Sequence, residues 1–143
     1  MEISNHMRDE HRMCDDEFAK VEQAVNGGDF GAAFSAFENF MVDTLKHFDR
    51  EEEVLFPAFE AATLSTEGPT QVMRYEHNQV RGLLEQMKDA LDKQDKDAFF
   101  SVADTLMILL QQHNMKEEQM LYAMCDQVLA EQAKELVEKM KNH

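Results

Sequence analysis

The sequence predicts an all-α protein: an antiparallel up-down-up-down four-helix bundle with a short fifth helix at the C-terminus. Apolar residues recur at spacings of three and four through most of the chain, as they do on one face of a helix. Only 5 Gly and 2 Pro interrupt the 143 residues, too few for the many turns of a stranded fold. The length suits a single domain, residues 1–143, with its own buried core.

The first two expected helices form a hairpin. The first runs over about 4–25, with Ser4 as a candidate N-cap, and the Asn-Gly-Gly sequence at 26–28 ends it. The second runs over about 29–62 and carries a broad apolar stripe. Pro57 lies inside it and should bend or weaken the helix unless that turn is already irregular, because proline lacks a backbone N–H.

Two more long helices follow a break at 63–69. They are expected over about 69–93 and 97–125, and a shorter amphipathic segment at about 127–141 is the fifth helix. The breaks between the long helices are short, so neighbouring helices must run antiparallel. This predicts a bundle over about 4–125.

The chain is acidic, with a formal net charge of −15 from 29 Asp and Glu against 14 Lys and Arg. Such a surface repels phosphate backbones and anionic lipids, so we expect no nucleic-acid partner and no membrane partner. No run of about 18 apolar residues is present, and the first residues lack the pattern of an export signal. Cys14 and Cys125 lie far apart, as expected for free thiols in the cytoplasm.

The sequence repeats itself with an offset of 66 residues. The offset aligns His11 with His77, His47 with His113, and Glu51 with Glu117. It also aligns Glu10 with Glu76, Glu52 with Glu118, Asp29 with Asp95, and Phe34 with Phe100. The repeat predicts two helical hairpins that pack about a pseudo-two-fold axis.

The aligned histidines and glutamates should meet at one depth in the bundle. Each glutamate follows its histidine by four residues, so both point from one helix face. At about 1.5 Å per residue, the histidines of each hairpin lie within roughly 3 Å of one height. A lone inward histidine or a lone His-x-x-x-Glu pair is usually an ordinary core or surface feature, but the doubled pattern predicts a metal site. The expected ligands are His11, His47, Glu51, His77, His113 and Glu117.

Imidazole and carboxylate ligands suit divalent first-row metals. We expect two iron ions, each held by two histidines, with both glutamates shared between them; zinc or manganese fits the same ligands. Four protein ligands for each metal leave coordination positions for oxygen, hydroxide or another small ligand. The open side should face the turns at 26–28 and 94–96.

Four short motifs surround these residues. They are Asp9-Glu10-His11, the run from His47 to Pro57, Glu76-His77, and the run from His113 to Glu118. The motifs resemble those of the hemerythrin-like family, also called the HHE cation-binding domain, over about residues 5–125. The resemblance implies an oxo- or hydroxo-bridged di-iron centre in an antiparallel four-helix bundle. It also implies the four aligned histidines as terminal ligands and Glu51 and Glu117 as bridging carboxylates.

The sequence departs from the classical oxygen-carrying branch of that family at two places. That branch has a second histidine on the third helix where this chain has Arg81. On the fourth helix it has an aspartate five residues after the histidine, where this chain has Glu117 four residues after His113. The four-histidine, two-glutamate pattern is closer to a bacterial branch that includes iron–sulfur-centre repair proteins. Those proteins carry an additional N-terminal cysteine-bearing domain, which these 143 residues do not contain.

Several residues beside the ligands have two interpretations. Five glutamates are expected at the surface or behind the ligands rather than on a metal: Glu10, Glu52, Glu53, Glu76 and Glu118. Asp15 and Arg81 correspond in the repeat, and they form either an ion pair that lines the ligand pocket or two solvated charges. Cys14 is expected to be an inert buried thiol rather than a redox group. Tyr122 is expected to hold its hydroxyl at the rim rather than in the centre.

The favoured function is the binding of O2, NO or peroxide for sensing, scavenging or delivery. Enzyme motifs of other kinds are absent from the sequence, so a ligand-binding metalloprotein is favoured and an enzyme stays open. The alternatives are iron storage or donation, repair of iron–sulfur centres, a di-iron enzyme that consumes peroxide or NO, and a helical module with incidental metal. The chain is expected to be a monomer or a homodimer, and the last helix either caps the bundle or forms the dimer interface.

Overall fold

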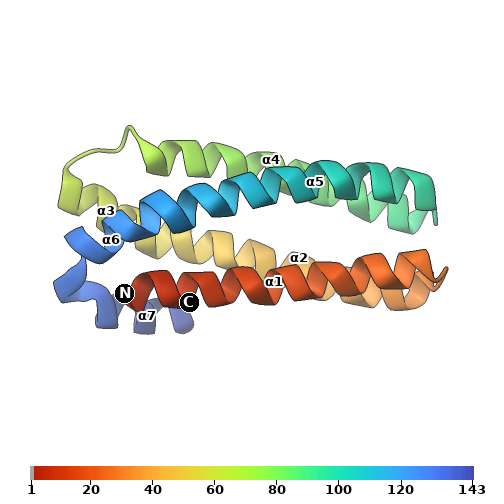
Figure 1. Cartoon of the computed structure of the whole chain (residues 1–143), viewed down its shortest axis with the longest axis horizontal. Coiled ribbons are helices and arrows are strands. Elements are labelled where there is room, and N and C mark those ends of the chain that lie inside the picture. Colours follow the sequence, from red (N-terminus) through yellow and green to blue (C-terminus); the bar gives the residue numbers. More distant parts are fainter. Residues whose placement is uncertain (1) are drawn as a thin grey trace.

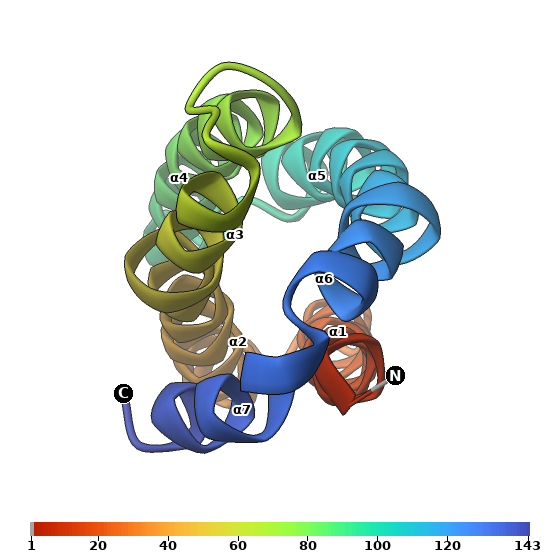
Figure 2. The same cartoon turned by 90° about the vertical axis from the view of Figure 1, so that its left-hand side faces the viewer.

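The computed structural model describes residues 2–143, and all elements in that range are helical, which confirms the all-α prediction. The four long helices are α1 (Glu2–Asn26), α2 (Phe30–Arg50), α4 (Pro69–Asp92) and α5 (Lys96–Lys116). They lie side by side along the long axis of the molecule (Figure 1). Seen from one end, they surround a common interior (Figure 2).

Two of the long helices continue through an irregular turn. After α2 come the π-helical turn η1 (Glu51–Leu55) and α3 (Phe56–Thr63), and after α5 come the π-helical turn η2 (Glu117–Leu121) and α6 (Tyr122–Val128). In both turns a backbone N–H bonds the carbonyl five residues earlier, Phe56 to Glu51 and Tyr122 to Glu117. The expected helices at 29–62 and 97–125 are therefore each two α-helices joined by a π turn.

The first π turn also accommodates Pro57. This residue lies in the first turn of α3, directly after η1. The first turn of a helix does not need the N–H that proline lacks, so proline is tolerated there. The turn at Pro57 is thus already irregular, and this is the case in which the proline was not expected to bend or weaken the helix.

The turns between the long helices keep the 66-residue repeat. Asp29 and Asp95 are the N-caps of α2 and α5, and each carboxylate accepts a 3.0 Å hydrogen bond from the N–H three residues later. The residue before each cap has a left-handed backbone, with φ of 77° at Gly28 and 53° at Gln94. Glycine adopts this conformation freely, whereas Gln94 must be held in it by the turn.

The buried apolar residues form two clusters. The turn-end cluster includes Phe18, Val21, Phe37, Phe40, Leu84, Met87 and Phe99. The terminus-end cluster includes Ile3, Met7, Leu55, Phe59, Leu121, Leu129 and Met140. Along α1, Met7 belongs to the second cluster and Phe18 to the first, and the buried His11 lies between them. The polar interior therefore occupies a layer between two apolar ends.

The last helix starts later than the expected residue 127. Leu129 leaves the helical region with φ −112° and ψ 18°, and a 3-10 turn, η3 (Ala130–Gln132), precedes α7 (Ala133–Lys141). Helix α7 packs against α1 and η1, and its Leu136 and Met140 are buried in the terminus-end cluster. Helix α7 therefore covers the terminus-end cluster, as expected of a helix that caps the bundle, and a role of α7 in a dimer interface stays a prediction. Within residues 2–143 no helix combines the length and the hydropathy that a membrane crossing requires.

Candidate metal centre

The six residues that the sequence predicts as ligands lie together in the interior. They are His11 from α1, His47 from α2, Glu51 from η1, His77 from α4, His113 from α5 and Glu117 from η2. Each is at most 4% exposed. Burying titratable groups costs free energy unless they are paired or coordinate a metal, so their mutual contacts decide the interpretation.

The four imidazoles form two pairs. The ring centroids of His11 and His47 are 4.7 Å apart, and those of His77 and His113 are 4.9 Å apart. We call these the His11 pair and the His77 pair. The ligand atoms of the His77 pair and both glutamates lie within 4.8 Å of one another, and so do those of the His11 pair and Glu117. These are two overlapping groups that can each hold a metal ion.

The two glutamates lie between the histidine pairs. Glu51 Oε1 is 3.1 Å from His77 Nε2 and 3.3 Å from His47 Nε2. Glu117 Oε1 is 3.2 Å from the Nε2 atom of each of the other two histidines. Each carboxylate therefore contacts one imidazole of each pair, which is the arrangement that a shared ligand requires.

Four of these buried ligand atoms have no hydrogen-bond partner within residues 2–143. They are Glu51 Oε1, His77 Nε2, His113 Nε2 and Glu117 Oε2. Nearby ligand atoms approach them without the angles that a hydrogen bond needs. An unsatisfied buried polar group costs about 1–3 kcal/mol, and one cation among the four would satisfy them together. The donor set thus fits a divalent first-row metal.

A carboxylate stands behind every histidine. The Nδ1 contacts are His11 with Glu118 (2.8 Å), His47 with Glu10 (2.7 Å), His77 with Glu52 (2.6 Å) and His113 with Glu76 (2.8 Å). When Nδ1–H donates to a carboxylate, Nε2 keeps its lone pair for a metal, and the ring orientation is fixed. All four imidazoles are therefore held with Nε2 toward the centre.

Each of these four glutamates also pairs with a basic side chain. The pairs are Glu118 with Arg8, Glu10 with Arg50, Glu52 with Arg81 and Glu76 with Lys116. The expected position behind the ligands is confirmed for these four glutamates. The fifth, Glu53, is exposed and pairs with His143.

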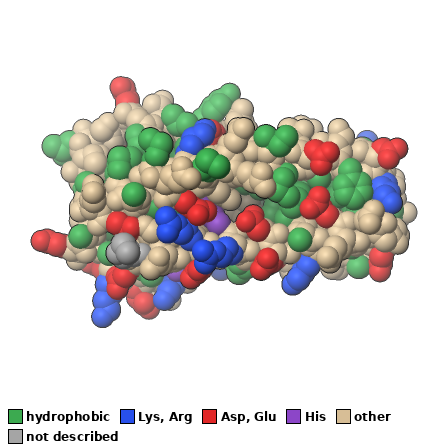
Figure 3. Space-filling view, viewed as in Figure 1, with side chains coloured by type: hydrophobic (Ala, Val, Ile, Leu, Met, Phe, Trp, Pro, Cys, Tyr) green, Lys and Arg blue, Asp and Glu red, His purple; other side chains and the backbone are tan. Residues whose placement is uncertain are grey.

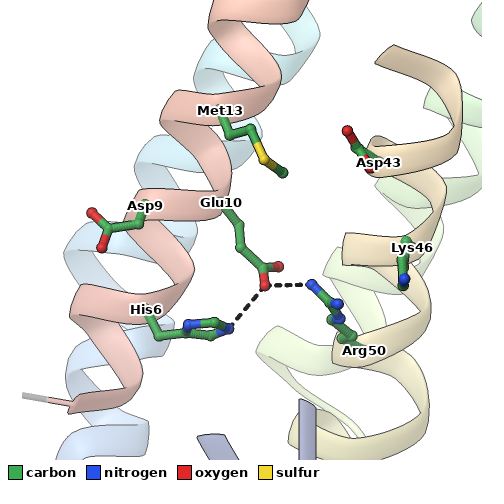
Figure 4. Close-up of a pocket in the computed structure, with 7 residues that line it drawn as sticks. All are labelled: His6, Asp9, Glu10, Met13, Asp43, Lys46 and Arg50. Carbon is green, nitrogen blue, oxygen red and sulfur yellow. Dashed lines mark hydrogen bonds and ion pairs between the residues drawn. The ribbon is translucent and has the colours of Figure 1, made fainter. Parts of the chain in front are cut away.

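Glu10 shows how such a carboxylate is kept ionised. Its Oε2 lies 2.8 Å from His6 Nε2 and 2.7 Å from Arg50 Nη1, at a surface pocket between α1 and α2 (Figure 4). Burial alone would raise the pKa of Glu10. The hydrogen bonds of His47 and His6, together with the charge of Arg50, instead hold that pKa well below its usual range. His6, which was not expected to be a ligand, belongs to this outer network.

The charges of the centre favour protonated imidazoles when no metal is bound. Burial acts to lower the pKa of His11 and of His113. The hydrogen bond and the negative charge of Glu117 at His11, and the negative charge of Glu117 at His113, instead raise each pKa to about 9. Burial and the neighbouring Glu117 raise the pKa of Glu51. Although burial opposes it, the charge of His113 keeps the pKa of Glu117 well below its usual range. A metal must therefore displace protons from this centre.

Tyr122 lies in the centre rather than at its rim, so the expectation for this residue is wrong. It is fully buried, and its Oη is 2.6 Å from Glu51 Oε2, 3.0 Å from Glu117 Oε1 and 3.2 Å from His11 Nε2. On an α-helix, residues five apart point in different directions, but a π turn brings them to the same face. The turn η2 therefore aligns Tyr122 with Glu117, which a helical wheel does not reveal.

Asp15 and Arg81 do not pair with each other, so the hypothesis of an ion pair between them is wrong. Arg81 Nη2 lies 2.9 Å from Glu52 and 3.8 Å from Asp49. Asp15 instead borders a small cavity on the other side of the centre. The two corresponding positions thus have different environments.

The cavity has a volume of about 30 Å³ and lies against His11 and His47. Its wall is mostly apolar and includes Phe18, Phe40, Phe48, Met107 and Leu110, and its polar edge includes Asp15, Thr44, Gln111 and Asn114. Cys14 also borders it, and burial raises the pKa of this thiol to about 12, so the thiol stays protonated at neutral pH. The space is about that of one water molecule.

Comparisons with known proteins give one result. Neither the curated proteins nor the solved structures contained a match to the chain. The family model described as the hemerythrin HHE cation-binding domain matches residues 2–125, which include all six candidate ligands and both π turns. The chain therefore belongs to the hemerythrin HHE cation-binding domain family, whose members bind metal.

Proposed function

We propose that this chain holds two iron ions and binds a small ligand, O2, NO or peroxide, for sensing, scavenging or delivery. The His11 pair holds one iron, the His77 pair holds the other, and Glu51 and Glu117 are shared. Support comes from the distances, because each carboxylate contacts one imidazole of each pair. The proposal includes an antiparallel up-down-up-down order of the four helices, which brings the two pairs to one level. Iron would supply redox chemistry and coordination positions for the small ligand.

The cavity beside the His11 pair carries the small-ligand proposal. It contacts the imidazoles of His11 and His47, and about 30 Å³ accommodates a diatomic molecule or peroxide but no organic substrate. Its mostly apolar wall favours a neutral guest over a hydrated ion. We therefore propose that the ligand binds on the side of the His11 pair.

The side chains around the cavity favour binding over catalysis. The Cys14 thiol stays protonated, and the hydroxyl of Tyr122 is occupied by the carboxylates of the centre. No described residue at the cavity forms a nucleophile–base pair. The carboxylates behind the histidines also favour retention of the metal over its donation. Cys14 and Cys125 are free, which fits the cytoplasmic location that we propose.

Metal analysis and optical spectroscopy test this function. We expect chain purified without oxygen to contain two iron ions per molecule, and we expect new visible absorption bands on addition of O2 or NO. Binding should be stoichiometric, and sustained consumption of peroxide or NO with a reductant would identify an enzyme instead. A colourless protein that carries zinc would overturn the proposal.

A further inference from the structure

A stripe of uncharged, exposed residues runs along each of the two long helices of the second hairpin, and the exposed Asp104 and Lys116 border the stripe on α5. On α4 the residues of the stripe are Val72, Tyr75, Gln79, Gly82 and Gln86. On α5 they are Ser101, Thr105, Ile108, Gln112 and Met115. All ten are exposed and follow one another at spacings of three and four, which places them on one stripe of each helix. We call this surface the α4–α5 face.

A groove of about 530 Å³ runs along this face between the two helices. The nine residues that line it are all uncharged, and four of them are amides: Asn78, Gln79, Gln86 and Gln112. At Gly82, an added Cβ would meet no other atom within 4 Å, so the backbone is open to close approach from outside. The exposed Ile108 adds an apolar side chain at the centre of the stripe.

The first hairpin provides an internal comparison, because the repeat places its residues on the equivalent face. On α1 the corresponding residues are His6, Asp9, Met13, Asp16 and Lys20. On α2 they are Ser35, Asn39, Val42, Lys46 and Asp49. The pocket on this face is lined by charged groups from both helices, including Asp9, Lys46 and Arg50 (Figure 4). Charged side chains on the equivalent face of the first hairpin are therefore compatible with the fold. The lack of charge on the α4–α5 face is not required for folding.

Figure 3 shows the side of the molecule formed by α1 and α5, so the α4–α5 face is seen there only along the upper edge. Most Lys and Arg side chains in this view lie over the lower part, where α1 runs. Exposed apolar side chains grouped on one face of a charged protein are typical of an interaction site.

We propose that the α4–α5 face is a homodimer interface, on which a second copy of this chain packs its own α4–α5 face about a two-fold axis. Two copies with a net charge of −15 repel each other wherever charged faces meet, so an uncharged face is where they can approach. Amide side chains both donate and accept hydrogen bonds, so a face rich in them is complementary to itself.

The size of the face indicates a weak dimer. Each stripe rises about 21 Å along its helix, and two adjacent helices span roughly 20 Å in width. The contact therefore covers roughly 400 Å² on each copy, about 800 Å² in total, which is below the roughly 1,200–2,000 Å² of stable specific interfaces and typical of weak, transient ones. We expect a dissociation constant in the micromolar range.

Ile108→Glu tests the interface, and Val42→Glu is its matched control. The two residues correspond in the repeat and are 59% and 58% exposed, so neither change should alter folding. Sedimentation equilibrium from about 10 µM to about 1 mM should show a monomer–dimer equilibrium for the unmodified chain. Ile108→Glu should weaken it at least tenfold, because it places two like charges near the two-fold axis, and Val42→Glu should leave it within about twofold.

Salt and metal extend the test. Added salt should strengthen the dimer, because it screens the repulsion between two acidic copies and removes no interfacial ion pair. The association should be the same in the metal-free and metal-loaded chain, so failure of the di-iron proposal does not affect it. A chain that stays monomeric at about 1 mM, or equal weakening by both substitutions, would overturn the proposal and leave the face to a different partner.

Discussion

The two sides of the candidate metal centre have matching candidate ligands and different surroundings. On the side of the His77 pair, the Phe48 ring stacks on His77 with centroids 3.9 Å apart and planes at 13°. Phe56 lies nearly parallel to the same imidazole at 5.8 Å, and the guanidinium of Arg81 lies over the Phe48 ring. This side is filled by aromatic rings and covered by a cation.

The repeat places different residues at the same positions around His11. Asn114 corresponds to Phe48, Tyr122 to Phe56, and Asp15 to Arg81. The small amide of Asn114 leaves the space that Phe48 fills on the other side, and the cavity lies there. Near-symmetric candidate ligands therefore do not give the two candidate metal positions equivalent surroundings. Access to each position is decided by the residues around the ligands.

Removal of the Phe48 ring, which fills the side of the His77 pair, should have the largest effect, a loss of stability. Phe48 is 1% exposed and packs on His77, so Phe48→Ala should lower the free energy of unfolding of the metal-free chain by about 3–5 kcal/mol. Asn114→Ala, the matched change beside the existing cavity, should cost under about 1 kcal/mol. Urea unfolding followed by circular dichroism measures both. Equal losses would mean that the two sides are packed alike.

Protonation of the histidines should weaken metal binding at both histidine pairs. His11 and His113 come from different pairs, and the pKa of each is about 9, above the usual value of about 6.5. Between about pH 6.5 and about pH 9, a metal must displace the protons of these two histidines. The affinity for Zn²⁺, a redox-inert probe, should therefore rise about tenfold per pH unit for each proton released. Calorimetric titration in two buffers with different ionisation enthalpies counts the protons.

The stability of the metal-free chain should change in the opposite direction with pH. A raised histidine pKa stabilises the fold fully below about pH 6.5, and this contribution is lost as the pH rises through about 9. The free energy of unfolding should therefore fall over the range in which metal affinity rises. Metal binding at pH 7 without proton release would contradict this account.

Filling the cavity should close the open side. Asn114→Phe copies the residue that the chain itself uses at the equivalent position, Phe48. We expect association of NO with the iron-loaded protein to slow at least 30-fold, since about 30 Å³ leaves no room for both a ring and a ligand. Stopped-flow spectroscopy measures the rate, and metal analysis should still give two ions. An unchanged rate would show that the ligand reaches the centre by another route.

Much of this centre follows from the sequence, because its spacing is helical. His47 and Glu51 are four residues apart, and the 66-residue offset repeats that pair at His113 and Glu117. A constant rise per residue then brings the histidines to one level. That the six residues bind metal stays a prediction, whereas their convergence is observed.

The rest of the centre could not be predicted, because it depends on breaks in helical regularity and on the choice of partners. The π turn η2 brings Tyr122 onto the face of Glu117, and a helical wheel with 100° per residue places it elsewhere. Arg81 forms its ion pair with Glu52 and not with Asp15, and this pairing depends on distances between residues of three helices. The late start of α7 depends on how Leu129 packs, which periodicity does not describe.

Removal of the Tyr122 hydroxyl should change the affinity for Zn²⁺ by a smaller factor than filling the cavity changes the rate of NO association. Tyr122→Phe removes a hydrogen bond to Glu51 and makes this side resemble the one at Phe56. Loss of such a contact behind a metal ligand should weaken Zn²⁺ binding by about tenfold. The reciprocal change, Phe56→Tyr, should not strengthen it, because the cost of burying a second hydroxyl offsets any gain. Competition titration with a coloured chelator compares the two variants, and equal effects would remove the distinction between the sides.

Removal of the Arg81 side chain should have the smallest effect on ligand affinity, because Arg81 covers the side of the His77 pair, where we do not expect the ligand to bind. Its guanidinium pairs with Glu52 and is partly exposed, and such pairs contribute under about 1 kcal/mol. Arg81→Ala should therefore change the affinity for NO by less than about twofold. Asp15→Ala is the matched change at the edge of the cavity, and it should change that affinity by about threefold or more, because it alters the electrostatic field where the ligand binds. Equilibrium titration of the two iron-loaded variants decides the order of the effects. A larger effect at Arg81 would mean that the ligand binds beside His77, and the assignment of the open side would be reversed.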